Sequence, residues 1–376
     1  MPVFLSVVGA RPNFMKVAPL HHAFRAYAGA LTHRILHTGQ HYDEKMSKVF
    51  FDDLELPQPD VFLGVGSGTH AQQTARVMVE FEKALQSERP DLVIVVGDVN
   101  STLACSVTAS KLGIPVAHVE AGLRSFDRDM PEEINRLVTD VLSDYLFVTE
   151  QAGLENLARE GVPASKVHFV GHVMIDSLMR YRGRPSAAQA LATHGVDASR
   201  YILVTLHRPS NVDSEENLAK ILRIFEGLRD DAPILFPVHP RTRQRLADTG
   251  LASSFEALPN LRLCDPIGYV DFLALEEHAG VVMTDSGGIQ EETTFLQVPC
   301  LTLRENTERP VTVTHGTNQL LGLDVDAAVR LAREALEGKG KRGMIPDLWD
   351  GHAAERIAAV LARDFGVEMT GGTVPA

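Results

Sequence analysis

Short apolar runs alternate with helical patterns along most of the chain. The first part contains runs rich in β-branched and aliphatic residues at 3–8, 92–96, 116–120, 145–149 and 167–171. Between them, apolar positions recur with helical spacing, as at 102–113 and 134–145. Apolar strands separated by helices are typical of a parallel sheet with helices on both faces. This part is therefore predicted to be a doubly wound α/β domain.

A second series of the same kind follows, with apolar runs at 201–207, 234–239, 261–265, 281–285 and 299–303. The stretch between the two series, YRGRPSAAQA at 181–190, is basic, contains Gly and Pro, and has no strand pattern. A chain of 376 residues is too long for one ordinary core. We therefore expect two Rossmann-like domains facing a cleft, at 1–175 and 185–350. The amphipathic helix at 351–365 is expected to pack back on the first domain.

Composition and net charge limit the classes of partner that the chain can bind. Hydrophobic residues make up 44% and charged residues 23%, as in soluble globular proteins. A net charge of −13 argues against a nucleic-acid partner or an anionic membrane. The N-terminal apolar run is too short to span a membrane. The three cysteines (Cys105, Cys264 and Cys300) have no metal-like spacing and lie in apolar surroundings, so we expect reduced, buried thiols in a cytoplasmic protein.

Polar residues follow several of the predicted strands. They are Arg11, Asp98 and Glu120 in the first domain, and His207, His239 and Asp285 in the second. Ligands of open α/β sheets bind beyond the carboxyl ends of the strands, so these residues are candidates for a site. Two structural alternatives stay open: Asp98 as the N-cap of the next helix, and His207 as a buried core histidine. The first turn, GARPNF, lacks the dinucleotide fingerprint, so no redox cofactor is indicated.

The stretch DSGGIQEE at 285–292 predicts a strand that turns directly into a helix. Ser286 is a favourable N-cap, and Gly287 and Gly288 leave the first N–H groups without side-chain cover. Such a helix start attracts a phosphate through its partial positive charge. The alternative is a capped helix without a ligand.

Seven segments together carry a resemblance to a known family. In chain order they are GARPNFMKVAP (9–19), VGDVNST (96–102), HVEAGLR (118–124), MPEEINR (130–136), TLHRPSNVD (205–213), DSGGIQEE (285–292) and NTERP (306–310). Over residues 3–365 the chain resembles the non-hydrolysing UDP-N-acetylglucosamine 2-epimerase family. The resemblance implies the glycosyltransferase-B fold, catalysis without a cofactor or metal, a homodimer, and a role in cell-surface polysaccharide biosynthesis. The DRD stretch at 127–129 imitates a metal motif of sugar transferases, but it lies in a charged loop rather than at a strand end.

The resemblance also implies residue roles. Asp98, Glu120 and Glu132 would be the acid/base groups, and His207 would face the charge that develops on departing UDP. The implied binding residues are Arg11, Lys16, Arg136, Phe272, Ser286, Gly287, Gly288, Glu292 and Arg309. Phe272 would mark a loop beside the uracil, and Glu292 would bind the ribose hydroxyls. Glu291 is expected to be a helix-dipole residue.

Some alternatives stay open at this point. Allosteric relatives hold a second UDP-GlcNAc with a Gln-His-x-x-Met stretch, whereas this chain has extra residues between Gln40-His41 and Met46. We therefore expect hyperbolic kinetics without a regulatory site. The same stretch resembles relatives that epimerise UDP-2,3-diacetamido-glucuronic acid, so the sugar is undecided. A hydrolysing 2-epimerase, a glycosyltransferase and a non-catalytic nucleotide-sugar sensor are the competing functions; a sensor would lack an acid/base group, and none is missing.

Overall fold

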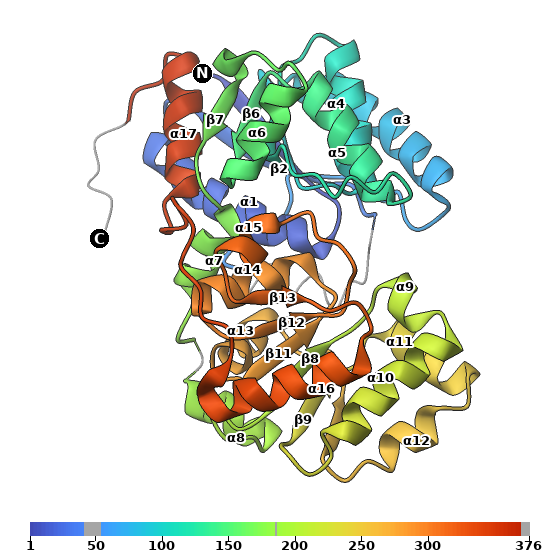
Figure 1. Cartoon of the computed structure of the whole chain (residues 1–376). Coiled ribbons are helices and arrows are strands. Elements are labelled where there is room, and N and C mark those ends of the chain that lie inside the picture. Colours follow the sequence, from blue (N-terminus) through green and yellow to red (C-terminus); the bar gives the residue numbers. More distant parts are fainter. Residues whose placement is uncertain (41–53, 185, 370–376) are drawn as a thin grey trace. The chain divides into compact units, whose positions relative to one another are not determined.

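The apolar runs form two sheets, with helices on both faces of each (Figure 1). The computed structural model describes residues 1–40, 54–184 and 186–369. The first sheet has seven strands in the order β3-β2-β1-β4-β5-β6-β7, and the second has six in the order β10-β9-β8-β11-β12-β13. Every strand pair is parallel. The predicted α/β class with two Rossmann-like, doubly wound sheets is confirmed.

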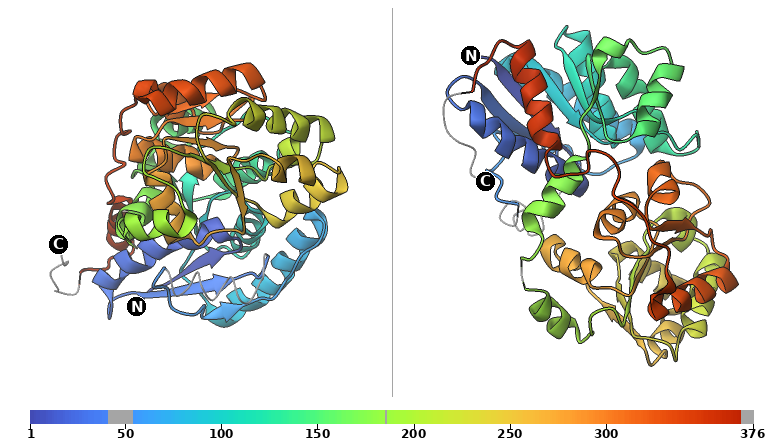
Figure 2. Two further views of the ribbon diagram at one scale, coloured as in Figure 1. Left: turned by 90° about the horizontal axis from the view of Figure 1, so that it is seen from below. Right: turned by 60° about the vertical axis from the view of Figure 1, so that its left-hand side comes forward.

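The chain divides into two compact units. Unit 1 comprises Met1–Met179 and Asp347–Ala376, and unit 2 comprises Arg180–Pro346. The boundary near 180 lies at the edge of the stretch that the sequence marks as a break. The C-terminal segment from Asp347 belongs to unit 1, where helix α17 (Ala353–Asp364) packs against α1 (Arg11–Phe24), as Figure 2 shows.

The strands of unit 1 are β1 (Val3–Val8), β2 (Thr32–His37), β3 (Val61–Phe62), β4 (Leu92–Val96), β5 (Val116–Ala121), β6 (Tyr145–Val148) and β7 (Val167–Phe169). Besides α1 and α17, the helices among the described residues of unit 1 are α3 (His70–Glu88), α4 (Asn100–Lys111), α5 (Pro131–Leu142), α6 (Gln151–Arg159) and α7 (Val173–Tyr181), the last of which crosses into unit 2.

The strands of unit 2 are β8 (Ile202–Thr205), β9 (Ile234–Pro237), β10 (Leu261–Cys264), β11 (Val281–Thr284), β12 (Cys300–Thr302) and β13 (Asn318–Leu320). Its helices are α8 (Ala187–His194), α9 (Pro209–Val212), α10 (Glu215–Gly227), α11 (Pro240–Asp248), α12 (Ala252–Glu256), α13 (Tyr269–Glu277), α14 (Gly287–Leu296), α15 (Pro310–Thr314) and α16 (Val325–Glu334).

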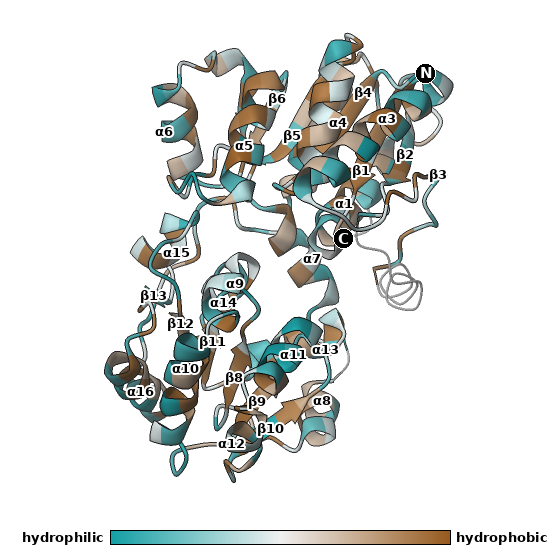
Figure 3. Cartoon of the chain, turned by 90° about the vertical axis from the view of Figure 1, so that its right-hand side faces the viewer, coloured by the Kyte–Doolittle hydropathy of each residue, from teal (hydrophilic) through white to brown (hydrophobic). Residues whose placement is uncertain are grey.

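Burial explains why the apolar runs become central strands. All five residues of β4 are buried, and so are all four residues of β11, because helices cover both faces of each sheet. Figure 3 shows β8 and β9 in the brown of hydrophobic residues and α11 in the teal of hydrophilic ones. No helix of the described residues is long and apolar enough to cross a membrane.

Three strands and one cysteine depart from the sequence-based expectations. The sequence pattern misses β2, which carries polar residues in the run THRILH, and the short strands β3 and β13 at the sheet edges. The expectation of three buried thiols holds for Cys105 and Cys300, but Cys264 is only half-buried at the end of β10.

The strand order fixes where each unit offers a binding site. In both sheets the order reverses direction once, between β1 and β4 in unit 1 and between β8 and β11 in unit 2. At such a switch point the connections leave to opposite faces of the sheet, and a crevice opens beyond the carboxyl ends of the strands. The residues after β1 and β4, and those after β8 and β11, therefore occupy the positions where a ligand is expected.

Candidate active site

The turn after β1 packs tightly against α4. The side-chain oxygen of Asn13 accepts hydrogen bonds from the N–H groups of Gly9 (3.0 Å) and Ala10 (2.9 Å), and its amide donates to the carbonyl of Val96 (3.1 Å). A Cβ added at Gly9 would lie 2.4 Å from Ser101 Oγ, so only glycine fits there. This packing fixes α1, which begins at Arg11, and so places Lys16 on its second turn.

Glu120 lies at the end of β5 in an unusual backbone conformation. Its φ is +79°, and the register between β5 and β6 shifts between Val119 and Ala121. A non-glycine residue at positive φ costs about 1–3 kcal/mol and persists only where the surrounding structure imposes it. The irregularity turns the buried Glu120 carboxylate toward Lys16, with which it forms an ion pair. Strain of this kind clusters at functional sites.

Asp98 lies in the turn after β4, where Arg136 holds it. Arg136 donates from α5 to the Asp98 carboxylate at 2.5 Å, and Asn135 donates to the Asp98 carbonyl at 2.8 Å. Helix α4 begins only at Asn100, with Val99 as its N-cap residue, so the N-cap alternative for Asp98 is wrong. The Asp98 side chain retains 23% exposure, whereas that of Arg136 retains 3%.

The two neighbouring glutamates at the start of α5 differ in their surroundings. Glu133 is buried, and its carboxylate accepts hydrogen bonds from Ser125, from the backbone N–H of Phe126 (3.0 Å) and from Arg136 (2.9 Å). It therefore anchors the loop that precedes α5. Glu132, the residue before it on the helix, is less buried. This difference favours Glu132 over Glu133 as the residue available to a ligand.

A buried network beneath this site was not singled out from the sequence. His118, on β5, contacts Asp140 with one ring nitrogen (2.6 Å) and the Gly97 carbonyl with the other (2.9 Å). Burial raises the pKa of Asp140, but the charges and hydrogen bonds of His118 and Arg124 outweigh it and hold the pKa below its ordinary value. His118 thus ties β5 to the turn that carries Asp98. Its only signal in the sequence is a histidine inside an apolar strand.

In unit 2, Asp285 organises the turn after β8. Its carboxylate accepts hydrogen bonds from the backbone N–H groups of His207 (3.0 Å) and Arg208 (2.9 Å) and from the Asn211 amide (3.1 Å). It also contacts His207 Nδ1 at 3.1 Å. Burial raises the pKa of Asp285, but the hydrogen bonds and charge of His207 outweigh it, and the pKa lies below its ordinary value. Asp285 is therefore a carboxylate at neutral pH.

That carboxylate orients His207. Because Nδ1 faces Asp285, Nε2 is the ring nitrogen left for a ligand, and the His207 side chain is 45% exposed. The ring centroid of His239 lies 6.1 Å away. The alternative of a buried core histidine at 207 is therefore wrong.

The start of α14 follows directly after Asp285. Helix α14 begins at Gly287 with Ser286 as its N-cap residue, as predicted, although the Ser286 side chain makes no capping hydrogen bond. A Cβ added at Gly288 would meet no atom within 4 Å, whereas one at Gly287 would lie 2.4 Å from Arg309 Nη1. Gly288 thus leaves the helix start open, and Gly287 allows the Arg309 guanidinium to approach.

The charge of Arg309 is compensated inside unit 2. Its guanidinium pairs with Glu291 at 2.6 Å and also with Glu308, and its side chain is only 7% exposed. The expectation for Glu291 as a helix-dipole residue is wrong, because Glu291 lies beyond the first turn of α14 and is buried in this ion pair. Arg309 therefore supports the helix start from behind.

Glu292, next on α14, accepts a hydrogen bond from the Tyr269 hydroxyl at 2.9 Å. Tyr269 begins α13, and Phe272 lies on the same helix, half-buried against the core. The expected loop at Phe272 is therefore wrong: the run YVDFLALEE is helical. The sequence also did not single out Glu276, a fully buried carboxyl group on α13 that faces Glu292.

The Gln40–Met46 stretch, which is longer than the Gln-His-x-x-Met stretch of allosteric relatives, lies outside the described residues from His41 onward.

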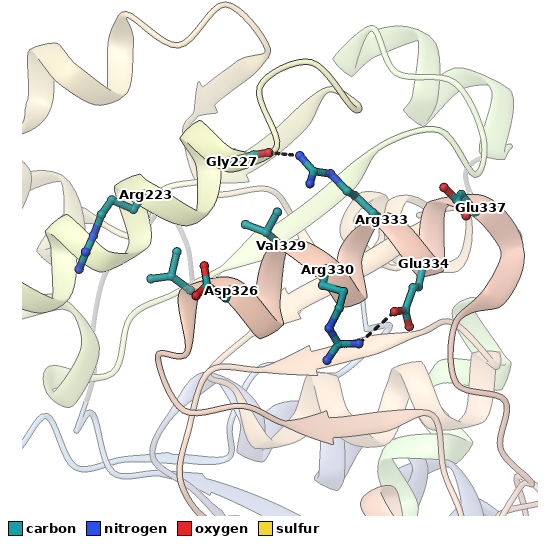
Figure 4. Close-up of a pocket in the computed structure, with 9 residues that line it drawn as sticks. Arg223, Gly227, Asp326, Val329, Arg330, Arg333, Glu334 and Glu337 are labelled. Atoms are coloured by element: carbon teal, nitrogen blue, oxygen red, sulfur yellow. Dashed lines mark hydrogen bonds and ion pairs between the residues drawn. The ribbon is translucent and has the colours of Figure 1, made fainter.

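A surface hollow of about 500 Å³ lies between α10 and α16, away from the strand ends (Figure 4). Two of its arginines are already engaged, since Arg330 donates to Glu334 at 2.9 Å and Arg333 donates to the Gly227 carbonyl at 2.6 Å. It is therefore a weaker candidate than the switch-point residues.

Comparison with known proteins gives a consistent result. The family described as UDP-N-acetylglucosamine 2-epimerase matches residues 25–362. A Methanocaldococcus jannaschii protein named UDP-N-acetylglucosamine 2-epimerase is 43% identical over 360 residues, covering 94% of this chain and 97% of the relative. The crystal structure of the Methanocaldococcus jannaschii UDP-GlcNAc 2-epimerase with UDP-GlcNAc and UDP superposes with a TM-score of 0.88 at 41% identity, covering 96% of this chain and all of that one.

A third relative acts on a different sugar. The UDP-2,3-diacetamido-2,3-dideoxy-D-glucuronate 2-epimerase of Pseudomonas aeruginosa is 41% identical over 362 residues, covering 96% of this chain and 99% of the relative. The similarity is nearly as high as for the relative named for UDP-GlcNAc, so overall identity does not separate the two sugars.

Proposed function

The chain belongs to the UDP-N-acetylglucosamine 2-epimerase family, and from that premise we propose that it interconverts UDP-GlcNAc and UDP-ManNAc without hydrolysis. The resemblance expected from the sequence is confirmed. The observation that carries the proposal is the pairing of His207 with Asp285 in a member of this family. Asp285 directly precedes Ser286 and the two glycines that begin α14.

The chemistry requires a departing diphosphate because C2 has no neighbouring carbonyl to acidify its proton. The electron pair of the C2–H bond forms a double bond between C1 and C2, and UDP leaves with the C1–O pair. The intermediate is 2-acetamidoglucal. In the second half, a proton adds to the opposite face of C2 and the UDP oxygen re-forms its bond to C1. One group must act as base and another as acid.

Unit 1 supplies the acid/base groups in this proposal: Asp98, Glu120 and Glu132. Support comes from the strained backbone of Glu120 and from the hydrogen bonds that fix Asp98. Lys16 and Arg136 hold two of these carboxylates, so their role is to set carboxylate position and charge as well as to attract the diphosphate. Arg11, whose side chain lies outside the described part of the structure, is also proposed to contact the diphosphate.

Unit 2 supplies the nucleotide site. The imidazole of His207, with Asp285 behind it, donates from Nε2 to the UDP oxygen that gains charge as the C1–O bond breaks. The N–H groups that follow Ser286 bind a phosphate, with Gly288 giving access and the Arg309 guanidinium lying against Gly287. Phe272 on α13 lies toward the uracil.

Glu292 is proposed to accept hydrogen bonds from the ribose hydroxyls. The Tyr269 hydroxyl donates to this buried carboxylate and so fixes its position, and a carboxylate accepts hydrogen bonds from the two hydroxyls of a diol.

A second candidate is C2 epimerisation of a UDP-2,3-diacetamido-glucuronic acid. The similarity to the Pseudomonas aeruginosa enzyme favours it, and the same elimination at C1 and C2 would serve both sugars.

For assembly, we propose a homodimer in the cytoplasm that supplies an activated sugar for cell-surface polysaccharide. Helix α5 offers a surface suited to a second copy. Ile134, Val138 and Val141 recur at helical spacing on one face and are 47%, 37% and 75% exposed.

The test is product identity. Incubation with UDP-GlcNAc in deuterated water, followed by proton and phosphorus NMR, should give UDP-ManNAc with deuterium at C2 of both sugars. Free ManNAc with UDP would identify a hydrolysing enzyme. Turnover of the diacetamido-glucuronate alone would identify the second candidate.

A further inference from the structure

Two carboxyl groups meet in the interior of unit 2, on adjacent helices. Glu276 on α13 is 0% exposed and Glu292 on α14 is 2% exposed, and the two side chains interact directly. A buried pair of this kind cannot carry two negative charges, because each charge is desolvated and repels the other. One proton must therefore be shared between them.

The hydrogen bonds decide which residue keeps the proton. Glu292 already accepts the Tyr269 hydroxyl at 2.9 Å, which stabilises its charged form. Among the described residues, by contrast, no donor reaches either side-chain oxygen of Glu276. A buried carboxylate without donors is strongly unfavourable, but a neutral carboxyl can donate to Glu292. Burial and the Glu292 charge raise the pKa of Glu276 well above its ordinary value, which agrees with this assignment.

Among the described residues, the other groups that interact with Glu276 carry no compensating positive charge. Tyr201, before β8, Tyr269, on α13, and Cys300, on β12, all interact electrostatically with Glu276. Burial raises the pKa of each, that of Cys300 to about 12, so all three are neutral at neutral pH. The Tyr201 hydroxyl donates to the Leu275 carbonyl and is thereby occupied. Glu292 is then the only charge in this set of described groups.

We propose that Glu276 is a positioning residue that keeps its proton and donates a hydrogen bond to Glu292, fixing that carboxylate to recognise the ribose diol of the substrate. This inference rests on the proposed function, in which Glu292 binds ribose. Two donors, Tyr269 and Glu276, then fix the orientation of the Glu292 carboxylate that the two hydroxyls contact. Nucleotide recognition thereby depends on the proton of Glu276, a residue that does not itself contact the ligand.

The neighbouring residue provides a matched control. Glu277 follows Glu276 on the same helix but pairs with Arg182 at the surface at 2.6 Å. Glu276→Gln retains a donor of the same size, Glu276→Leu removes it with little change in volume, and Glu277→Gln changes an exposed carboxyl group. Ribose recognition is read as the ratio of the Kd values of UDP and 2′-deoxy-UDP by calorimetry.

We expect Glu276→Leu to weaken UDP binding about tenfold, the scale of one lost charge-assisted hydrogen bond, with a much smaller effect on 2′-deoxy-UDP. KM should rise while kcat changes little, because the contact is the same in ground state and transition state. Glu276→Gln and Glu277→Gln should keep the wild-type preference at pH 7. An unchanged UDP to 2′-deoxy-UDP ratio in Glu276→Leu would overturn the inference.

Alkaline pH gives a second measurement. Removing the proton from Glu276 places two charges together, so wild-type binding of UDP should weaken as pH rises, whereas Glu276→Gln should follow only the titration of the ligand. Coincident profiles would contradict the proposal. A third, ligand-free measurement keeps it testable if variants bind poorly: the infrared carbonyl band of a protonated carboxyl should be present at pH 7 in wild type and in Glu277→Gln and lost in Glu276→Gln. A wild-type protein that shows this band but binds no UDP would refute the proposed function and leave the shared proton intact.

Discussion

Replacing Asp285 by asparagine tests the orientation of His207. The carboxylate accepts four contacts, two of them from His207 itself, at 3.0 Å from its N–H and at 3.1 Å from Nδ1. Asparagine keeps the shape and one acceptor oxygen but removes the negative charge that faces Nδ1 of His207. Nε2 would then lose its fixed direction at the moment when UDP departs.

The expected loss is one preorganised donor at the developing charge, about 2–4 kcal/mol in the barrier, or roughly 30- to 1,000-fold in kcat. Binding of UDP should weaken less than about tenfold, because the phosphate site at α14 remains and the charge on UDP peaks as the bond breaks. The assay is epimerisation of UDP-GlcNAc by NMR together with the Kd of UDP by calorimetry.

Asp213→Asn is the control, because Asp213 is a surface carboxyl group that pairs with Arg245 at 3.3 Å. It should leave kcat within about twofold. The reasoning is refuted if Asp285→Asn keeps kcat within about threefold of wild type. It is also refuted if kcat and UDP affinity fall together with the melting temperature, since Asp285 would then only hold the fold.

Three further outcomes follow from the structure. Glu120→Gln should lower kcat by at least about 100-fold and abolish deuterium entry at C2, measured by NMR, whereas retained exchange would exclude Glu120 as an acid/base group. Burial lowers the pKa of His37 to about 4, so the unfolded chain binds more protons between pH 6.5 and 4 and stability should fall by roughly 3 kcal/mol as pH drops through that window. Urea unfolding should show this loss reduced in His37→Gln, and an equal loss would be contrary to the assignment. Val141→Asp should convert the dimer to a monomer by light scattering, while the exposed Val79→Asp on α3 should not; a dimer that survives Val141→Asp would exclude this face of α5.

The central strands could be predicted because burial on both faces demands continuous apolar runs. LVIVV at 92–96 becomes β4 over those same residues. The edge strands β3 and β13 were missed because they are only two and three residues long, and β13 reads Asn-Gln-Leu. Their strand conformation depends on neighbours such as β2 and β12, which a local pattern does not contain.

The residues of the candidate site likewise divide into those that a local sequence pattern predicts and those that it does not. Asp98, Glu120 and His207 could be found because polar residues after apolar strands are exceptional in a sequence. The groups that support them could not, because support comes from pairing across distant parts of the chain. Asp285 reaches His207 over 78 residues, and Glu276 reads as one of two ordinary glutamates in a helix. Only the fold reveals that Glu276 is buried and Glu277 is not.

The most direct test of the account is whether the bond between C1 and the UDP oxygen breaks during epimerisation. UDP-GlcNAc labelled with ¹⁸O in the bridge between C1 and the β-phosphate should be incubated with the enzyme and followed by phosphorus NMR. We expect the label to move to non-bridging positions of the β-phosphate at a rate comparable to deuterium entry at C2, because released UDP rotates before it adds back. Deuterium at C2 with the label still entirely in the bridge would contradict elimination of UDP.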